Sequence, residues 1–128
     1  MNEADLPHVV IGACMNIHRQ LGPGLARETY EECLAIELRE LEMDFQRGGM
    51  LSFDYRGKTI QGGVRLDFIV QDKLLLQVRS QEQLTALDKL QFESHLRLSG
   101  LRAGLLVNFN VAALRSGIHR VTLKRKES

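Results

Sequence analysis

The spacing of hydrophobic residues near the N-terminus is helical. Apolar positions recur every three or four residues, the period of one buried helix face. Asp5 is expected to cap this first helix, with Pro7 in its first turn. Its buried face is predicted to contain Leu6, Val9, Val10, Ala13, Ile17 and Leu21. The stretch LGPG at 21–24 ends the helix, because Gly22 can adopt a left-handed conformation and Pro23 cannot continue the hydrogen-bond ladder.

A second helix is predicted from Ala26 to Leu41, and the pattern then changes to strands. The inner face of this helix is expected to contain Tyr30, Cys33, Leu34, Leu38 and Leu41. Leu51, Phe53 and Tyr55 alternate with polar residues as in a strand, and RGK at 56–58 is a turn signal. RGG at 47–49 is more typical of a loop than of a nucleic-acid motif. Further strands are predicted at 64–70 and 74–79.

The C-terminal part continues the alternation of helix and strand. A third helix is predicted from Thr85 to Ser99, closed by Gly100. The continuous apolar run at 103–109 suits the middle of a sheet that is covered on both faces. A last strand around 118–123 precedes a charged tail that is expected to fray. The pattern predicts an α/β sandwich with a mixed β-sheet flanked by α-helices.

Composition supports one domain, residues 1–128, because a chain of this length can bury one core but not two. A formal net charge of +1 provides no general attraction to nucleic acid or to an anionic membrane. No apolar run approaches the ~20 residues that span a bilayer, and the acidic start lacks a signal-peptide pattern. Cys14 and Cys33 lie in apolar helical patterns and are expected to be free thiols. These features predict a cytoplasmic protein of bacterial type.

Polar residues interrupt the predicted hairpin RLDFIVQDKLLLQVRS at 65–80. Asp67 lies near its start, and Gln77 and Arg79 lie near its end. Residues 77 and 79 share one face of their strand, since side chains alternate with a period of two. Taken alone, Asp67 can be a simple ion-pair partner, and Gln77 and Arg79 can be solvated strand residues. The spacing also resembles a metal-dependent nuclease site that has lost part of its chemistry.

Six features in order carry a resemblance to a known family. They are LGPG, Tyr30, RLDFIV, QVRS, Gln91 and GLLVNF. The chain from the first helix to about Arg120 resembles the GxxExxY proteins of the PD-(D/E)XK nuclease-like superfamily. This resemblance implies a restriction-endonuclease-like core, a three- or four-stranded mixed sheet flanked by helices. It also implies a site made of a helical glutamate, a strand aspartate and a Glu-x-Lys on the next strand.

The sequence departs from the family pattern at these chemical positions. The segment from Gly24 to Tyr30 aligns without a gap, so the namesake glutamate falls on Arg27. Glu28 is adjacent, but one residue along a helix is a rotation of about 100°. The aspartate is kept as Asp67, whereas the Glu-x-Lys is replaced by Gln77 and Arg79. The tyrosine that usually follows the third-helix glutamine is His95.

These replacements change the electrostatics of the site. The family pattern carries two net negative charges, which suits a hard Mg²⁺ ion that activates water. Arg27, Asp67, Gln77 and Arg79 together carry one net positive charge. Gln77 still offers a carbonyl oxygen, but an arginine cannot give up its proton to serve as a base. The resemblance therefore implies a vestigial site, in which Asp67 is a metal ligand only if a metal is bound.

Other candidate residues give weaker evidence for a functional site. His18 and His95 lie in predicted helices, and no third ligand is spaced to join them in a metal site. Gln91 can face the vestigial site by the resemblance, although a surface amide is the simpler interpretation. LKRK at 123–126 is a short basic tail. The sequence contains no phosphate-binding loop, no CxxC pair and no Ser-His-Asp order.

Three hypotheses of function follow. The favoured one is a catalytically degenerate nuclease fold that serves as a noncatalytic binding or self-assembly module, with no cofactor. The second is a Mg²⁺-dependent nuclease with an altered site that recruits Glu28 or Glu31. The third is a nucleic-acid binder that uses Arg27 and Arg79 to hold phosphate without cutting; the near-neutral charge and few aromatic residues count against it.

Two structural expectations accompany the favoured hypothesis. The strand at 51–55 is expected at a sheet edge, where unpaired backbone groups favour a homo-oligomer. The guanidinium of Arg27 is expected within hydrogen-bonding reach of Asp67, making an internal ion-pair network that excludes metal.

Overall fold

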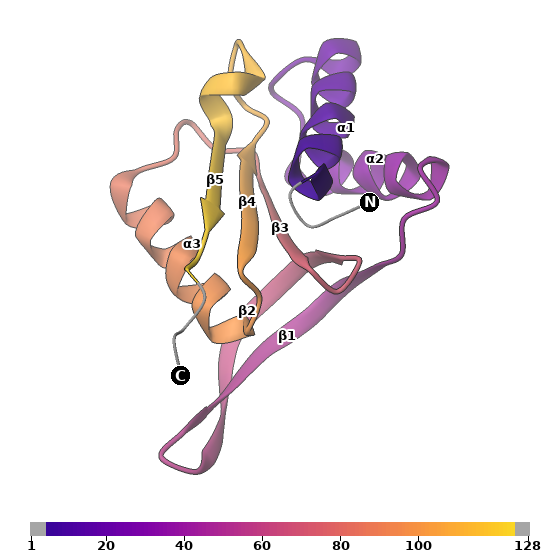
Figure 1. The fold of residues 1–128 in the computed structure, drawn as a ribbon. Coiled ribbons are helices and arrows are strands. Elements are labelled where there is room, and N and C mark those ends of the chain that lie inside the picture. The colour runs from indigo at the N-terminus through magenta and orange to yellow at the C-terminus, as the bar shows by residue number, and fades with distance from the viewer. Residues whose placement is uncertain (1–4, 125–128) are drawn as a thin grey trace.

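A computed structural model of the chain describes residues 5–124, which form a five-stranded mixed sheet between helices (Figure 1). Along the chain the elements are α1 (Asp5–Leu21), α2 (Arg27–Glu40), β1 (Phe45–Tyr55), β2 (Lys58–Val70), β3 (Leu74–Arg79), α3 (Ala86–Ser99), β4 (Ala103–Asn108), the short 3-10 helix η1 (Leu114–Gly117) and β5 (Ile118–Thr122). The strands lie in the order β1-β2-β3-β4-β5. Only β3 and β4 pair in parallel; the other neighbours are antiparallel. The predicted mixed sheet is confirmed, but it has five strands rather than three or four.

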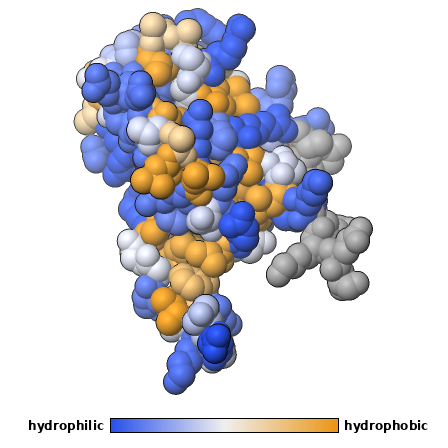
Figure 2. Space-filling model, turned by 90° about the vertical axis from the view of Figure 1, so that its left-hand side faces the viewer, coloured by the Kyte–Doolittle hydropathy of each residue, from blue (hydrophilic) through white to orange (hydrophobic). Residues whose placement is uncertain are grey.

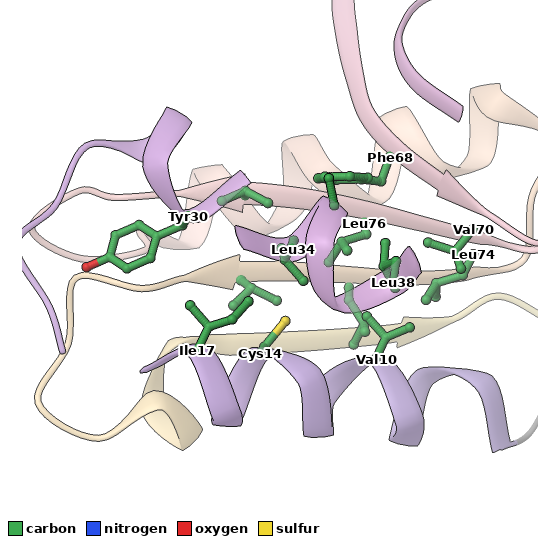
Figure 3. Packing of buried hydrophobic residues seen from close by; sticks show 14 of the residues in the cluster. Val10, Cys14, Ile17, Tyr30, Leu34, Leu38, Phe68, Val70, Leu74 and Leu76 are labelled. Carbon is green, nitrogen blue, oxygen red and sulfur yellow. The ribbon is translucent and has the colours of Figure 1, made fainter. Parts of the chain in front are cut away.

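Two apolar cores cover the two faces of the sheet, and Figure 3 shows residues of the larger one. The larger core lies under α1 and α2 and includes Val10, Leu34, Phe68, Leu76 and Val107. The smaller core lies under α3 and consists of Leu51, Leu66, Leu75, Phe92, Leu96 and Leu106. Alternate residues of β3 and β4 enter opposite cores, so the central position predicted for β4 is confirmed.

The corner between α1 and α2 is tied by one tyrosine. Gly22 has φ of 71°, the left-handed conformation expected at the end of α1. The Tyr30 hydroxyl donates a hydrogen bond to the Gly22 carbonyl (2.6 Å) and accepts one from the Leu25 amide (3.1 Å). The Tyr30 ring stacks on Phe109 with centroids 4.4 Å apart. These contacts fix where α2 begins and therefore where its first turn meets the sheet.

The hairpin of β1 and β2 is longer than predicted. Arg56 and Gly57 both have positive φ, as the tight hairpin turn requires. The expectation of a loop at 47–49 was wrong, since these residues lie within β1. Gly48 takes φ of 75° inside the strand. It therefore distorts the strand locally and does not reverse the chain. The predicted edge position of residues 51–55 is confirmed, because β1 is an outer strand.

Some predicted boundaries of the cores were also wrong. Leu21 and Leu41 are exposed, and each lies at the C-terminal end of its helix. Val9 and Cys33 are only half-buried, whereas Cys14 is fully buried; both cysteines are free thiols. The third helix matches its prediction, with Thr85 as the N-cap and Gly100 in the left-handed conformation. Residues 125–128 of the predicted tail lie outside the described residues. No helix within residues 5–124 has the length and hydropathy to cross a membrane.

Candidate functional site: an arginine–carboxylate network

The site lies where β2 and β3 separate. Their backbone pairing runs from Val70 and Leu74 to Phe68 and Leu76 and then stops. Beyond this point two buried side chains replace the backbone ladder. Gln77 accepts a hydrogen bond from the Asp67 amide (2.6 Å) and donates one to the Arg65 carbonyl (3.0 Å). Asp67 Oδ2 accepts from the Val78 amide (2.8 Å). We call this separation of β2 and β3 the fork. Asp67 and Gln77 provide hydrogen-bond partners for the backbone groups that the fork would otherwise leave unpaired.

Both carboxylate oxygens of Asp67 also make ionic contacts with arginines. Asp67 Oδ1 accepts a hydrogen bond from Arg65 Nη1 at 2.7 Å. Arg27 Nη1 lies 3.5 Å from the same oxygen. Arg79 Nη1 lies 3.5 Å from Oδ2 and donates to the Val78 carbonyl at 2.9 Å. The predicted approach of Arg27 to Asp67 is present, but as an ion pair rather than as two parallel hydrogen bonds.

A second buried carboxylate, Glu31, completes the site. It lies one turn after Arg27 on α2, with its side chain only 3% exposed. Arg27 Nη1 donates to Glu31 Oε2 at 2.6 Å, a shorter contact than the one Arg27 makes with Asp67. Arg47 Nη2 donates to Oε1 at 3.0 Å from the edge strand β1. The network therefore joins α2, β1, β2 and β3 at one place.

Arg65 bridges the two buried carboxylates. Its Nη1 donates to Asp67 at 2.7 Å and to Glu31 Oε2 at 3.2 Å, and its Nη2 donates to Glu31 Oε1 at 2.8 Å. The guanidinium is thus a cation placed between two acids that come from different elements. The guanidinium passes close to Gly48, since a Cβ at that position would lie in van der Waals contact with Arg65 Nη2, at 3.4 Å.

The outer side of the network is balanced by surface acids. Glu28 pairs with Arg27 and Glu32 pairs with Arg47, each at 3.2 Å, and both acids are exposed. Arg47 also packs its guanidinium over the Phe68 ring, 5.3 Å from the centroid.

The ionisation of the network follows from these contacts. Burial alone would raise the pKa of Glu31, but hydrogen bonds from Arg65 and Arg47 and the charges around it lower that pKa overall. The hydrogen bond to Glu31 likewise raises the pKa of the Arg65 guanidinium. Glu31 is therefore held as a carboxylate and Arg65 as a cation.

The remaining candidates from the sequence do not join the network. Gln91 is exposed on α3, and no hydrogen bond or ion pair connects it to the site in the described part of the chain. His18 lies elsewhere, with Nε2 2.8 Å from the Val111 carbonyl. Burial and the charge of Arg79 lower the pKa of His95, but His95 makes no ion pair with the two acids. Within residues 5–124 no group of three or more histidine, cysteine, aspartate or glutamate side chains could hold a metal ion.

A family model for the PD-(D/E)XK nuclease superfamily matches residues 4–121. The chain belongs to the PD-(D/E)XK nuclease superfamily. The mixed sheet with helices on both faces fits the restriction-endonuclease-like core of that superfamily. Comparisons with curated proteins and with solved structures give no match.

The metal chemistry of PD-(D/E)XK nucleases does not fit the residues present. Both buried carboxylates already accept from at least one guanidinium, and Arg65 lies between them. The strand positions expected to carry Glu-x-Lys hold Gln77, committed to backbone groups, and Arg79. Each oxygen that a metal ion would need is thus bonded to a positive or backbone donor.

Sequence reasoning found four network members and missed two. Arg27, Asp67, Gln77 and Arg79 were expected at the site, and Glu31 was considered only as a recruited metal ligand. Arg65 was overlooked although it is two residues from Asp67 on the same strand, a spacing that places both side chains on one face. Arg47 was hidden by its neighbouring glycines, which indicated a loop.

Proposed function

We propose that this member of the PD-(D/E)XK nuclease superfamily is catalytically inactive and functions as a noncatalytic binding or self-assembly module. The observation that carries the proposal is the position of Arg65, whose guanidinium bridges Glu31 and Asp67. A tethered cation at this place does electrostatically what a bound metal would do, but it cannot activate water.

The energetics favour the arginine over an ion from solution. A unit-charge pair at ~4 Å is worth about 4 kcal/mol near a protein surface. An incoming divalent cation would meet Arg27, Arg65 and Arg79, each already within 3.5 Å of Asp67. The two ionised acids, Glu31 and Asp67, are already paired with these arginines. They cannot both neutralise the arginines and supply the oxygens that Mg²⁺ requires.

Within the described network, neither Arg79 nor Glu31 is available as the general base that hydrolysis requires. Arg79 stands at the position where the family pattern has lysine, and a guanidinium does not deprotonate in proteins. Glu31 is held ionised, but its oxygens accept hydrogen bonds from three arginines. The site can therefore stabilise the fold without turning over a substrate.

The proposal is tested by incubating the purified chain with labelled DNA and RNA in Mg²⁺ and in Mn²⁺. We expect no cleavage above a buffer control. Metal-dependent cutting that disappears in Asp67→Ala would contradict the proposal and would favour the altered Mg²⁺ nuclease. Cutting that Asp67→Ala leaves unchanged would identify a contaminant.

Binding of nucleic acid without cutting is the less favoured alternative. Arg27 and Arg79 keep about a third of their side-chain surface exposed, so their outer donors can reach a phosphate. Glu28 and Glu31, however, already pair with Arg27. A gel-shift with short duplexes in a buffer without divalent metal separates this alternative from the main proposal.

A further inference from the structure

The tip of the β1–β2 hairpin is an arm that projects beyond the rest of the sheet (Figure 1). We define the arm as residues 52–61, which pair only with each other, from Ser52 and Gln61 to Tyr55 and Lys58. The third strand, β3, pairs with β2 only at 68–70. An isolated two-stranded hairpin is marginally stable in water, so an arm of this kind needs a surface to pack on.

The arm has one mainly apolar face, which also carries Lys58 opposite Tyr55, and one polar face. Phe53 and Ile60 are cross-strand partners, and Tyr55 shares their face. This face continues from Leu51, which is buried in the core under α3 together with Phe92. The opposite face carries Ser52, Asp54, Thr59 and Gln61. The arm therefore extends the apolar face of the sheet past the end of its own covering helix.

The outer face of α3 carries exposed apolar side chains. Leu87, Leu90 and Leu98 are 73%, 60% and 41% exposed. At about 100° per residue these three fall within one sector of the helix, opposite the buried Phe92 and Leu96. We call them the outer leucine stripe. Figure 2 views the molecule from the α3 side and shows hydrophobic side chains gathered there and down onto the projecting hairpin.

We propose that two copies of this chain form a two-fold dimer in which the arm of each copy packs its apolar face on the outer leucine stripe of the other. One chain presents an apolar sheet face without a helix and an apolar helix face without a sheet. A second copy provides both missing halves, and two-fold symmetry makes the contact twice. This inference rests on the proposed function, which holds that the chain acts by binding, and it names the partner.

The area available is adequate for such a dimer. Taking about 200 Å² for a large side chain, the exposed parts of Tyr55, Ile60 and the three leucines amount to about 550 Å² per copy. Two copies then contribute about 1,100 Å², just above the ~1,000 Å² expected of a specific interface. The backbone and the polar rim add to this figure.

The test begins with the mass of the intact chain in solution, by size-exclusion chromatography with light scattering. The chain has a mass of 14.5 kDa, and we expect a dimer at twice that mass. An arm variant, Tyr55→Ser with Ile60→Ser, and a helix variant, Leu87→Ser with Leu90→Ser, should each weaken dimerisation by about tenfold or more. Ile36→Ser is the matched control, because Ile36 is 56% exposed on α2, away from both surfaces. Circular dichroism establishes that each variant is folded.

A mixture of the two variants distinguishes this arrangement from others. The arm variant keeps an intact stripe and the helix variant keeps an intact arm, so a mixed dimer has one intact contact whereas each variant alone has none. We expect mixing to restore dimers. Variants that dimerise like the control, or a mixture that stays monomeric while the wild type is dimeric, would overturn the arm-on-helix arrangement.

Other outcomes also decide the matter. A wild-type monomer at about 100 µM, far above typical affinities of specific complexes, would overturn the inference but leave the catalytic proposal intact. A dimer that cuts nucleic acid would overturn the catalytic proposal but leave the dimer. Formation of a complex only with a different protein would overturn the second copy as occupant.

Discussion

Removing Arg65 should both weaken the fold and create a cation site. The Arg65→Ala variant loses three charged hydrogen bonds, one to Asp67 at 2.7 Å and two to Glu31 at 2.8 and 3.2 Å. A charged hydrogen bond contributes about 1.5–3 kcal/mol. Because the Arg65 side chain is 40% exposed and Glu31 keeps Arg27 and Arg47, water and these neighbours replace part of the loss. We therefore expect the free energy of unfolding to fall by about 2–3 kcal/mol.

Urea denaturation with and without Mn²⁺ measures both effects. With a typical slope of about 1–3 kcal/mol per molar urea, the midpoint should fall by about 0.7–3 M. Mn²⁺ should then stabilise the variant, by about 2.7 kcal/mol at a hundred times its dissociation constant, and leave the wild type unchanged. Arg115→Ala, an exposed arginine of η1, is the control. The reasoning is refuted if Arg65→Ala is no less stable than this control, or if Mn²⁺ stabilises the wild type equally.

Three further predictions concern the partners of Arg65. Asp67→Asn should lower the free energy of unfolding by about 1–3 kcal/mol in chemical denaturation, because three partly buried cations lose an ionised partner; an unchanged urea midpoint would contradict this. Since the folded-state pKa of Glu31 lies below its ordinary value of 4.5, its contribution is present above pH 4.5 and is lost as pH falls through the lower folded value. Glu31→Gln should therefore flatten the pH dependence of the melting temperature below pH 4.5, and a slope equal to that of the wild type would count against the network. Gly48→Ala should destabilise the fold by about 1 kcal/mol through the strain of its positive φ, whereas Gly49→Ala, at a position without positive φ and with no atom within 4 Å, should have a smaller effect on the melting temperature.

Periodicity predicted the helices and the central strands of this fold well, because burial of one face is a local property of the sequence. The ends of α1 and α3 were also predictable, since Gly22 and Gly100 supply the left-handed conformation that closes each helix. The extent of β1 was not, because glycines inside a strand and glycines in a turn give the same local signal.

The network was predictable only where the chain itself sets the spacing. The pair Arg27 and Glu31 follows from the helix period, and the pair Arg65 and Asp67 follows from the strand period. From the sequence, the strand period was applied only to Gln77 and Arg79. The contact between Arg65 and Glu31 depends on how α2 packs beside β2, which no local pattern encodes. For the same reason the approach of Arg27 to Asp67 was expected, but its stronger bond to Glu31 was missed.

Anomalous diffraction from crystals grown with Mn²⁺ tests the central claim most directly. The account predicts that the Arg65 guanidinium lies between Glu31 and Asp67, with no anomalous peak at that place. A peak within ~2.2 Å of Asp67, the distance of a metal–carboxylate bond, with Arg65 turned away toward solvent, would contradict it and identify the site as a working metal centre.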